Sequence, residues 1–157
     1  MNRQERNALD RHITVNYGED QFKSESAHFV IHISTIPHSM QRYNTAGDWE
    51  FPSDDDNRPV MNLNVKVSVT SDWRVAACVA VHELVEALLC KNNGINTEQV
   101  DKFDTEVGIA LEDPGDHPEA PYQREHCIAT AIERILVAEF GMKWADYEAA
   151  LEELSHE

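Results

Sequence analysis

One segment restricts the fold of this chain more than any other, because it forms a helix that is apolar on nearly every side. It covers residues 73–90, where valine, alanine and leucine fill most positions. Ser71 or Asp72 can cap its start, and Lys91-Asn92-Asn93-Gly94 supplies stop signals at its end. A helix without a polar face is a buried helix, so the rest of the chain must pack around it.

Three ionisable side chains stand in the middle of this helix: His82, Glu83 and Glu86. A buried, ionised carboxylate without a partner is strongly destabilising, so these groups must meet a cation, share protons or line a cleft. At about 100° per residue, His82 and Glu86 lie one turn apart on the same side, and Glu83 lies roughly 60° from Glu86. This is the arrangement that a helix offers to a metal ion, so we expect a metal-binding or catalytic site here.

Two later segments place further ionisable groups on faces that should pack inward. A helix expected at residues 97–111 carries Asp104 within its apolar stripe, and a helix expected at 120–140 carries His126 within its own. Three helices would therefore direct acid or imidazole groups toward the interior. This convergence adds Asp104 and His126 to the candidate metal ligands.

Each of these later groups also has an ordinary structural interpretation. His126 alone could be a hydrogen-bonded core histidine, and Asp104 alone a buried hydrogen-bond acceptor. Glu133 lies two turns from His126 on the same expected helix, and we expect it to pair with Arg124 or Arg134 rather than to bind a metal.

The first half of the sequence has the alternation of β-strands. Apolar side chains recur with a period of two over residues 29–34 and, more clearly, over residues 61–70. The second segment should have one buried face and one solvent-exposed face, as in an antiparallel or edge strand. Residues 43–51 are expected to be extended with a turn, and 52–59 to form a loop. Strands before helices predict an α+β fold in one domain, 1–157. We expect a small antiparallel sheet in the N-terminal half, packed against a helical C-terminal half with the buried motif helix at its centre.

The charge of the chain argues against several classes of partner. Its 157 residues include 13 Lys and Arg against 29 Asp and Glu, a formal net charge of −16 with neutral histidine. Nucleic acids and anionic membranes need basic patches, so we expect neither as a partner, whereas metal cations, basic partners and cationic substrates fit. The first residues, MNRQERNALDRH, are too polar for a signal peptide, and the three cysteines form no CxxC pair. We therefore expect a cytoplasmic protein without disulfides.

The pentapeptide HELVE resembles the HExxH signature of the zincin metallopeptidases, with Glu86 at the position of the second histidine. The resemblance implies that His82 is a zinc ligand and that Glu83 is the general base that activates water. Glu86 would take the place of the second ligand. The third ligand would be Asp104 or His126.

The resemblance also implies a fold and an activity. The chain would be a zincin-like metal-dependent hydrolase that uses metal-activated water to attack a peptide or amide bond of a peptide or protein substrate. The strand at 61–70 would be the edge strand before the motif helix, and an extended substrate could pair with it. Zinc is the expected metal, and if both His82 and His126 are ligands, two imidazoles with one carboxylate form a known zinc set. The exchange of imidazole for carboxylate also admits manganese, iron or magnesium.

Three stretches, RYNTAGDW, VHELVEALLC and GDHPEAPYQREH, are similar to proteins encoded by phages and prophages. That likeness implies no activity, but it would place the chain in the cytoplasm of a host cell. A non-catalytic function follows from it as one alternative. The chain would then be an acidic phage protein that binds a basic host surface, with its buried histidines and glutamates holding a structural metal.

A second enzymatic interpretation uses carboxylates alone. ELVE at residues 83–86 and DKFD at 101–104 are similar to the paired ExxE and ExxD motifs of all-α nucleotide pyrophosphohydrolases. Carboxylates are suitable ligands for magnesium, and the bound magnesium would in turn bind the phosphates of a triphosphate substrate. The strands expected in the first 70 residues count against this interpretation, because that family has helices there.

Overall fold

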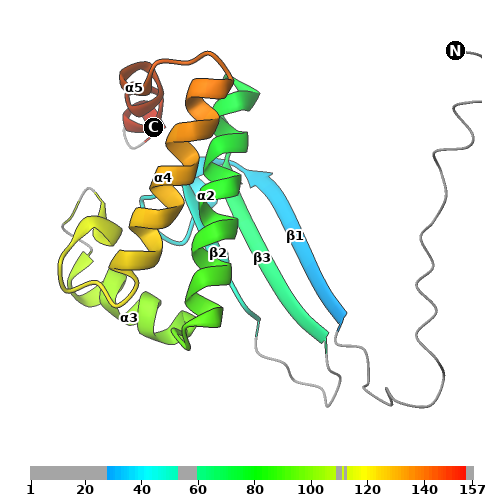
Figure 1. The fold of residues 1–157 in the computed structure, drawn as a ribbon, viewed down its shortest axis with the longest axis vertical. Coiled ribbons are helices and arrows are strands. Elements are labelled where there is room, and N and C mark those ends of the chain that lie inside the picture. Colours follow the sequence, from blue (N-terminus) through cyan, green and yellow to red (C-terminus); the bar gives the residue numbers. More distant parts are fainter. Residues whose placement is uncertain (1–27, 53–59, 109–110, 112, 155–157) are drawn as a thin grey trace, which may run out of the picture.

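The computed structural model describes residues 28–52, 60–108, 111 and 113–154, which form two layers (Figure 1). A three-stranded sheet is one layer, and helices are the other. The α+β class is confirmed, and nearly all of the loop expected at 52–59 lies outside the described residues. The elements are β1 (His28–Ile36), η1 (His38–Met40), β2 (Gly47–Glu50), β3 (Val60–Ser68), α2 (Trp73–Asn92), α3 (Thr97–Glu106), η3 (Pro114–Asp116), α4 (Gln123–Glu139) and α5 (Trp144–Leu154).

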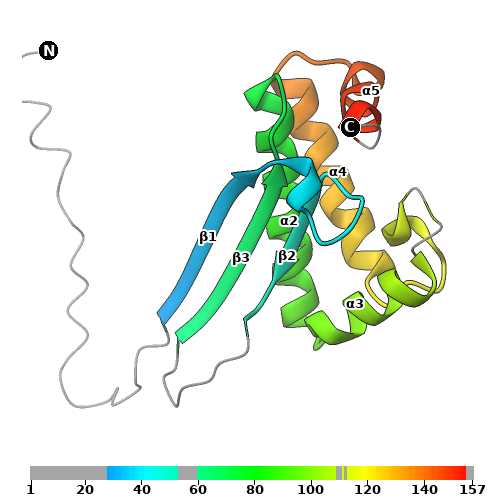
Figure 2. The same ribbon diagram turned by 180° about the vertical axis from the view of Figure 1, so that it is seen from behind.

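The sheet has the strand order β1-β3-β2 and is mixed rather than wholly antiparallel (Figure 2). β1 pairs with β3 in parallel, and β2 pairs with β3 in antiparallel orientation. Val65, in the middle of β3, therefore lies between Ile33 of β1 and Trp49 of β2. The expected antiparallel pairing holds only between β2 and β3.

The segment expected to be an edge strand, 61–70, is instead the central strand β3. Its alternation is as predicted, because Leu63, Val65 and Val67 are completely buried on the face toward the helices. Alternation shows which face of a strand meets water, but it does not show whether both edges are paired. Because β3 is paired on both edges, it cannot receive a substrate strand. The two edges of the sheet belong to β1 and β2.

α2 is the buried motif helix expected from the sequence. It packs against β2 and β3 on one side and against α4 on another (Figure 1). The side chain of Asp72 accepts a hydrogen bond from the backbone N–H of Arg74 and caps the start of the helix. Beyond its end, Gly94 has a φ of +76°, which favours glycine. Cys78 and Cys90 are buried on this helix as free thiols.

α3 is shorter than the helix expected at 97–111. It starts with a capping box between Asn96 and Gln99. After α3 the chain runs close to the following loop, and a Cβ at Gly108 would lie 2.8 Å from Cβ of Pro114. This close approach is incompatible with a larger side chain, so the loop after α3 is held tightly to the segment before α4. Within the described parts of the chain, no helix combines the length and apolarity that a bilayer crossing requires.

Candidate metal centre

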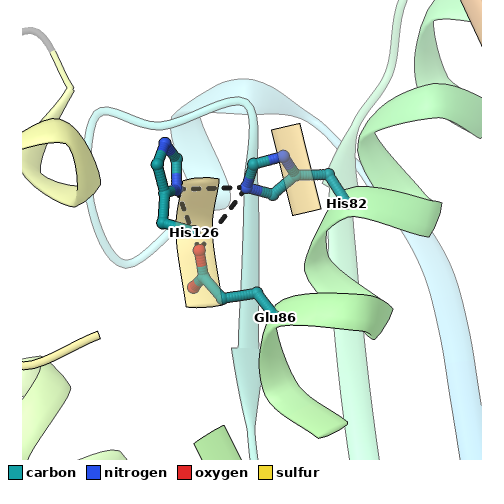
Figure 3. Close-up of side chains that lie close together, drawn as sticks. All are labelled: His82, Glu86 and His126. Carbon is teal, nitrogen blue, oxygen red and sulfur yellow. Dashed lines mark hydrogen bonds and ion pairs between the residues drawn. The ribbon is translucent and has the colours of Figure 1, made fainter. Parts of the chain in front are cut away.

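Three predicted side chains, His82, Glu86 and His126, converge where α2 meets α4 (Figure 3). His82 and Glu86 lie one turn apart on α2, and His126 lies near the start of α4. The Nδ1 atom of His126 is 2.9 Å from Oε2 of Glu86 and 3.2 Å from Nε2 of His82. The remaining pair, His82 Nε2 and Glu86 Oε2, is 3.5 Å apart. All three residues are buried, and we call them the ligand triangle.

The dimensions of the ligand triangle fit a metal ion. Imidazole nitrogen and carboxylate oxygen lie about 2.0–2.2 Å from zinc, which places ligands of a tetrahedral site roughly 3.4 Å apart. Neighbouring ligands of an octahedral site at similar bond lengths are about 3.0 Å apart. The three observed separations of 2.9, 3.2 and 3.5 Å span these values. The spacing of the three ligand atoms is therefore suited to a metal ion.

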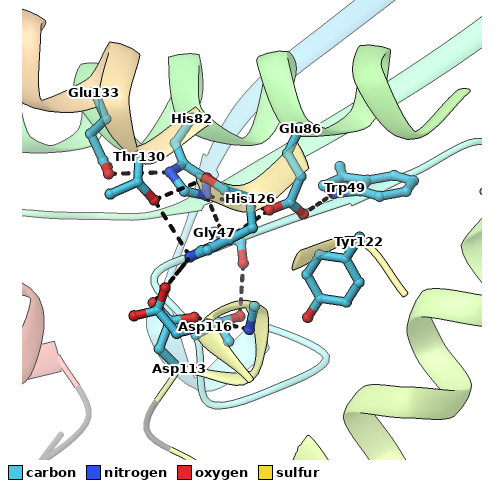
Figure 4. Close-up of polar contacts among 12 residues, drawn as sticks. Gly47, Trp49, His82, Glu86, Asp113, Asp116, Tyr122, His126, Thr130 and Glu133 are labelled. Carbon is cyan, nitrogen blue, oxygen red and sulfur yellow. Dashed lines mark hydrogen bonds and ion pairs between the residues drawn. The ribbon is translucent and has the colours of Figure 1, made fainter. Parts of the chain in front are cut away.

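The outer atoms of the two α2 residues are held by hydrogen bonds (Figure 4). Nδ1 of His82 lies 3.1 Å from Oε2 of Glu133, whose other oxygen accepts a hydrogen bond from the hydroxyl of Tyr147. The indole N–H of Trp49 donates to Oε1 of Glu86 over 2.8 Å. A carboxylate on the far nitrogen of a metal-binding histidine fixes the tautomer and the orientation of the ring. These contacts leave Nε2 of His82 and Oε2 of Glu86 directed at the centre.

The far nitrogen of His126 is held in the same way. Its Nε2 atom is 3.3 Å from Oδ2 of Asp113 and 3.8 Å from Oδ1 of Asp116. Asp113 is fixed by the backbone N–H of Gly115, which donates to its Oδ1 over 3.1 Å. The loop before α4 thus orients Nδ1 of His126 toward the other two ligand atoms. Asp113 and Asp116 also form with His126 a second, more exposed group of potential ligands.

The carboxylates around the two imidazoles favour positive charge at this centre. Burial lowers the pKa of His82, but hydrogen bonds with Glu133 and Glu86 outweigh it and raise the pKa to about 11. Burial also opposes a high pKa at His126, where bonds to Asp113 and Glu86 raise the pKa to about 10. Burial raises the pKa of Glu86, but its bonds with the two histidines lower it to about 2. The site therefore attracts protons or a cation.

Glu83, the predicted general base, lies beside the ligand triangle and lines the same cleft. Burial raises the pKa of its carboxyl group well above the usual range; the charge of His82 opposes this shift and the charge of Glu86 adds to it. Its side chain lies against the backbone of β2, where a Cβ at Gly47 would be only 2.6 Å from both Cγ and Oε1 of Glu83. Only glycine at position 47 leaves room for this carboxylate.

A cleft of about 600 Å³ opens onto the ligand triangle. The β2 edge, the four described α-helices and the η3 loop all contribute to its walls. No lysine or arginine lines it among the described residues. Its acidic lining residues are Asp48, Glu83, Glu86, Asp101, Asp104, Asp113, Asp116, Glu133, Glu148 and Glu152.

Asp104, the other candidate for the third ligand, lies in this cleft but apart from the ligand triangle. Its Oδ1 accepts a hydrogen bond from the hydroxyl of Tyr122 over 2.6 Å. Burial raises its pKa to about 6, although the bond from Tyr122 lowers it. In the described part of the chain, His126 and not Asp104 belongs to a group of clustered ligand atoms with His82 and Glu86.

The expectation that Glu133 pairs with an arginine is wrong, because Glu133 bonds to His82 and Tyr147. The guanidinium carbon of Arg134 lies instead 4.2 Å from the ring centre of Trp144. Arg124 is at the surface next to Glu125. Neighbouring positions on a helix point in different directions, so an arginine one residue away cannot reach the same interior contact.

Sequence reasoning missed the residues that hold the ligand triangle in place: Trp49, Asp113, Gly115 and Tyr147. They lie on a strand, a loop and a distant helix, where neither periodicity nor a short motif identifies them. A signal was present for two of them. Trp49 and Gly115 belong to the stretches RYNTAGDW and GDHPEAPYQREH, which together with VHELVEALLC contribute residues to the cleft, whereas Asp113 and Tyr147 lie outside these stretches.

Comparison with protein-family models, curated proteins and solved structures gives no match for this chain.

Gly115 provides a test of the tight packing behind His126. A Cβ at this position would lie 2.4 Å from Cγ and Nδ1 of the His126 ring, so we expect Gly115→Ala to displace the ring or the loop. Overpacking of this kind lowers the free energy of unfolding by about 1–3 kcal/mol, which urea denaturation measures. Glu119→Ala, at an exposed position in the same segment, is the control. Equal stability of the two variants would contradict the described contact.

Proposed function

We propose that this chain is a metal-dependent hydrolase in which His82, Glu86 and His126 hold one divalent ion and Glu83 is the general base. The observation that carries the proposal is the ligand triangle: three buried ligand atoms at metal-binding separations, each held from outside and facing a cleft. The substrate is a peptide or another amide. Water attacks its carbonyl carbon.

We propose zinc as the ion. Two imidazoles and one carboxylate form a catalytic zinc set, which leaves a fourth position for water or substrate. Iron(II) and manganese are the next candidates, because the same donors form the facial triad of non-haem iron sites. Magnesium prefers oxygen ligands and suits this set least.

A divalent ion held here would supply Lewis-acid polarisation of the substrate carbonyl and of water. The residues of the chain supply the rest. Glu83 lies next to His82 on α2 and lines the cleft. A cation held by the ligand triangle would favour the ionised form of this buried carboxyl group, which could then take a proton from the attacking water. The same group can then return the proton to the leaving amine. Glu133 and Asp113 keep the two imidazoles oriented during these steps.

The charge of the cleft supports a positively charged substrate. The residues that line it include many carboxylates, and within the described chain no lysine or arginine is among them. Such a lining raises the local concentration of cations and repels acidic substrates. We therefore expect peptides with lysine or arginine near the cleaved bond to be preferred.

The two alternative functions, an interaction protein with a structural metal and a magnesium-dependent pyrophosphohydrolase, account for fewer features of the ligand triangle and the cleft. A purely structural metal needs no open cleft beside it, whereas the ligand triangle lines one. A magnesium-dependent pyrophosphohydrolase would need the second acidic motif at the metal. Instead, the carboxylate of Asp101 lies 3.1 Å from Nη1 of Arg42, and Asp104 accepts from Tyr122.

Metal content is the first test. We expect about one zinc ion per chain in protein purified without added metal, measured by elemental mass spectrometry. His82→Ala and His126→Ala should each reduce this to near zero, because two remaining ligands bind far more weakly. His117→Ala, in the loop before α4, is the control and should keep the metal. Asp104→Ala should also keep it.

Circular dichroism of each variant shows whether lost metal reflects lost structure. Unchanged metal content in folded His82→Ala would exclude the ligand triangle as the binding site. Loss of metal in Asp104→Ala with retention in His126→Ala would make Asp104 the third ligand.

The affinity for zinc should rise with pH. Burial opposes high imidazole pKa values here, yet the carboxylate contacts raise them to about 11 for His82 and about 10 for His126. Protons therefore compete with the metal throughout the range from pH 6 to pH 7. Binding should release about two protons, and affinity should increase roughly a hundredfold per pH unit. Isothermal titration calorimetry in buffers of different ionisation enthalpy measures this number, and binding without proton release would contradict the prediction.

Glu83→Gln tests the general base. We expect the variant to keep its zinc but to cleave peptides about 10²–10⁴-fold more slowly, because the amide cannot accept the proton. A peptide library with lysine, arginine, aspartate or glutamate beside the cleaved bond also measures the charge preference. Glu139→Gln, at an exposed position on α4, is the control. A zinc-loaded protein that cleaves no member of the library would favour the structural metal.

A further inference from the structure

β1 is an edge strand whose outer side has no partner in the described part of the chain. The backbone N–H of Val69 donates to the carbonyl of Ile36 over 2.8 Å, so Ile36 directs its backbone groups toward β3. In a parallel pair alternate residues do so. Phe29, Ile31, Ile33 and Thr35 consequently direct their N–H and C=O groups outward. These groups form an open template for another strand.

The same residues leave an apolar surface uncovered. Phe29, Ile31 and Ile33 are 40%, 39% and 51% exposed. Ile31 and Ile33 pair with Leu63 and Val65, both fully buried, so all four side chains lie on the helix-facing side of the sheet. The helices cover this side over β2 and β3 but do not reach β1 (Figures 1 and 2).

The charge of β1 sets it apart from the rest of the chain. Its nine residues, HFVIHISTI, include no aspartate, glutamate, lysine or arginine, although the chain carries a net charge of −16. Two copies of so acidic a chain repel each other over most approaches. β1 lets them approach without bringing carboxylates of the two strands together.

The opposite edge of the sheet is closed to such pairing. The carbonyl of Trp49 accepts a hydrogen bond from Arg42, and the carbonyl of Gly47 accepts one from Thr45. β2 also has only four residues. Of the two edges of the sheet, only β1 therefore combines length, free backbone groups and exposed apolar side chains.

We propose that two copies of the chain associate through β1 in antiparallel orientation about a twofold axis at His32. This register pairs the full length of the two strands and places Ile31 opposite Ile33 of the partner subunit. Residues with outward backbone groups then face each other, so N–H and C=O groups are satisfied in both directions. The result is a continuous six-stranded sheet with the apolar residues of both strands side by side. A second copy fits because the strand is complementary to itself, as a twofold interface requires.

The oligomeric state of the full-length protein tests this proposal. Analytical ultracentrifugation at micromolar concentration should give about twice the 17.9 kDa mass of one chain. Ile33→Glu introduces a carboxylate at the proposed interface and should weaken association at least tenfold. Ile135→Glu is the matched control, because Ile135 is 62% exposed on α4, away from β1, and should leave the dimer intact. Unchanged circular dichroism of Ile33→Glu confirms that the variant is folded.

Hydrogen exchange distinguishes a second copy from other occupants of the edge. The amides of Ile31 and Ile33 should exchange slowly in the dimer and fast on dilution. Slow exchange at all concentrations in a monomer would mean that residues 1–27 of the same chain cover the strand, and it would overturn the proposal. A monomeric wild-type protein with fast exchange, or a dimer that persists in Ile33→Glu, would overturn it too.

Discussion

The structure depends on how the pair His82 and Glu86 is neutralised inside an apolar helix. Neither side chain can be buried alone, because the desolvation of each would be too unfavourable. His126 from α4 completes the set, and Glu133, Asp113 and Trp49 satisfy the outer atoms. The packing of α2 against α4 and against β2 is therefore also the packing that assembles the site. Core formation and the assembly of this potential metal-binding cluster use the same contacts.

The centre of the site was predictable because it rests on local periodicity. An all-apolar helix with His82, Glu83 and Glu86 at its middle can be recognised from residues 73–90 alone, and the inward faces of the two later helices offer Asp104 and His126 as further candidates. The choice between Asp104 and His126 as third ligand could not be made in this way. Helical periodicity gives the direction of a side chain around its own axis, but the separation of two helices depends on the whole fold.

The errors in the sheet have the same origin. Alternation in residues 61–70 correctly predicted which side chains are buried, but the pairing of the strand depends on β1 and on β2. β2 has only four residues and little alternation of its own, so its role in the cleft was hidden. Gly47 and Gly115 were equally hidden, because the reason for each glycine is a side chain that approaches from a distant element, Glu83 in one case and His126 in the other.

His126 contacts the buried floor with one ring nitrogen and the solvent-exposed η3 loop with the other. Hydrogen bonding at one nitrogen of an imidazole changes the basicity of the other nitrogen, so the exposed loop and the buried floor affect each other through this ring. Neutralisation or displacement of Asp113 and Asp116 would lower the electron density at Nδ1 of His126 and make this nitrogen a poorer electron-pair donor. The contacts of His126 therefore connect the acidity of the η3 loop to the basicity of a nitrogen in the ligand triangle.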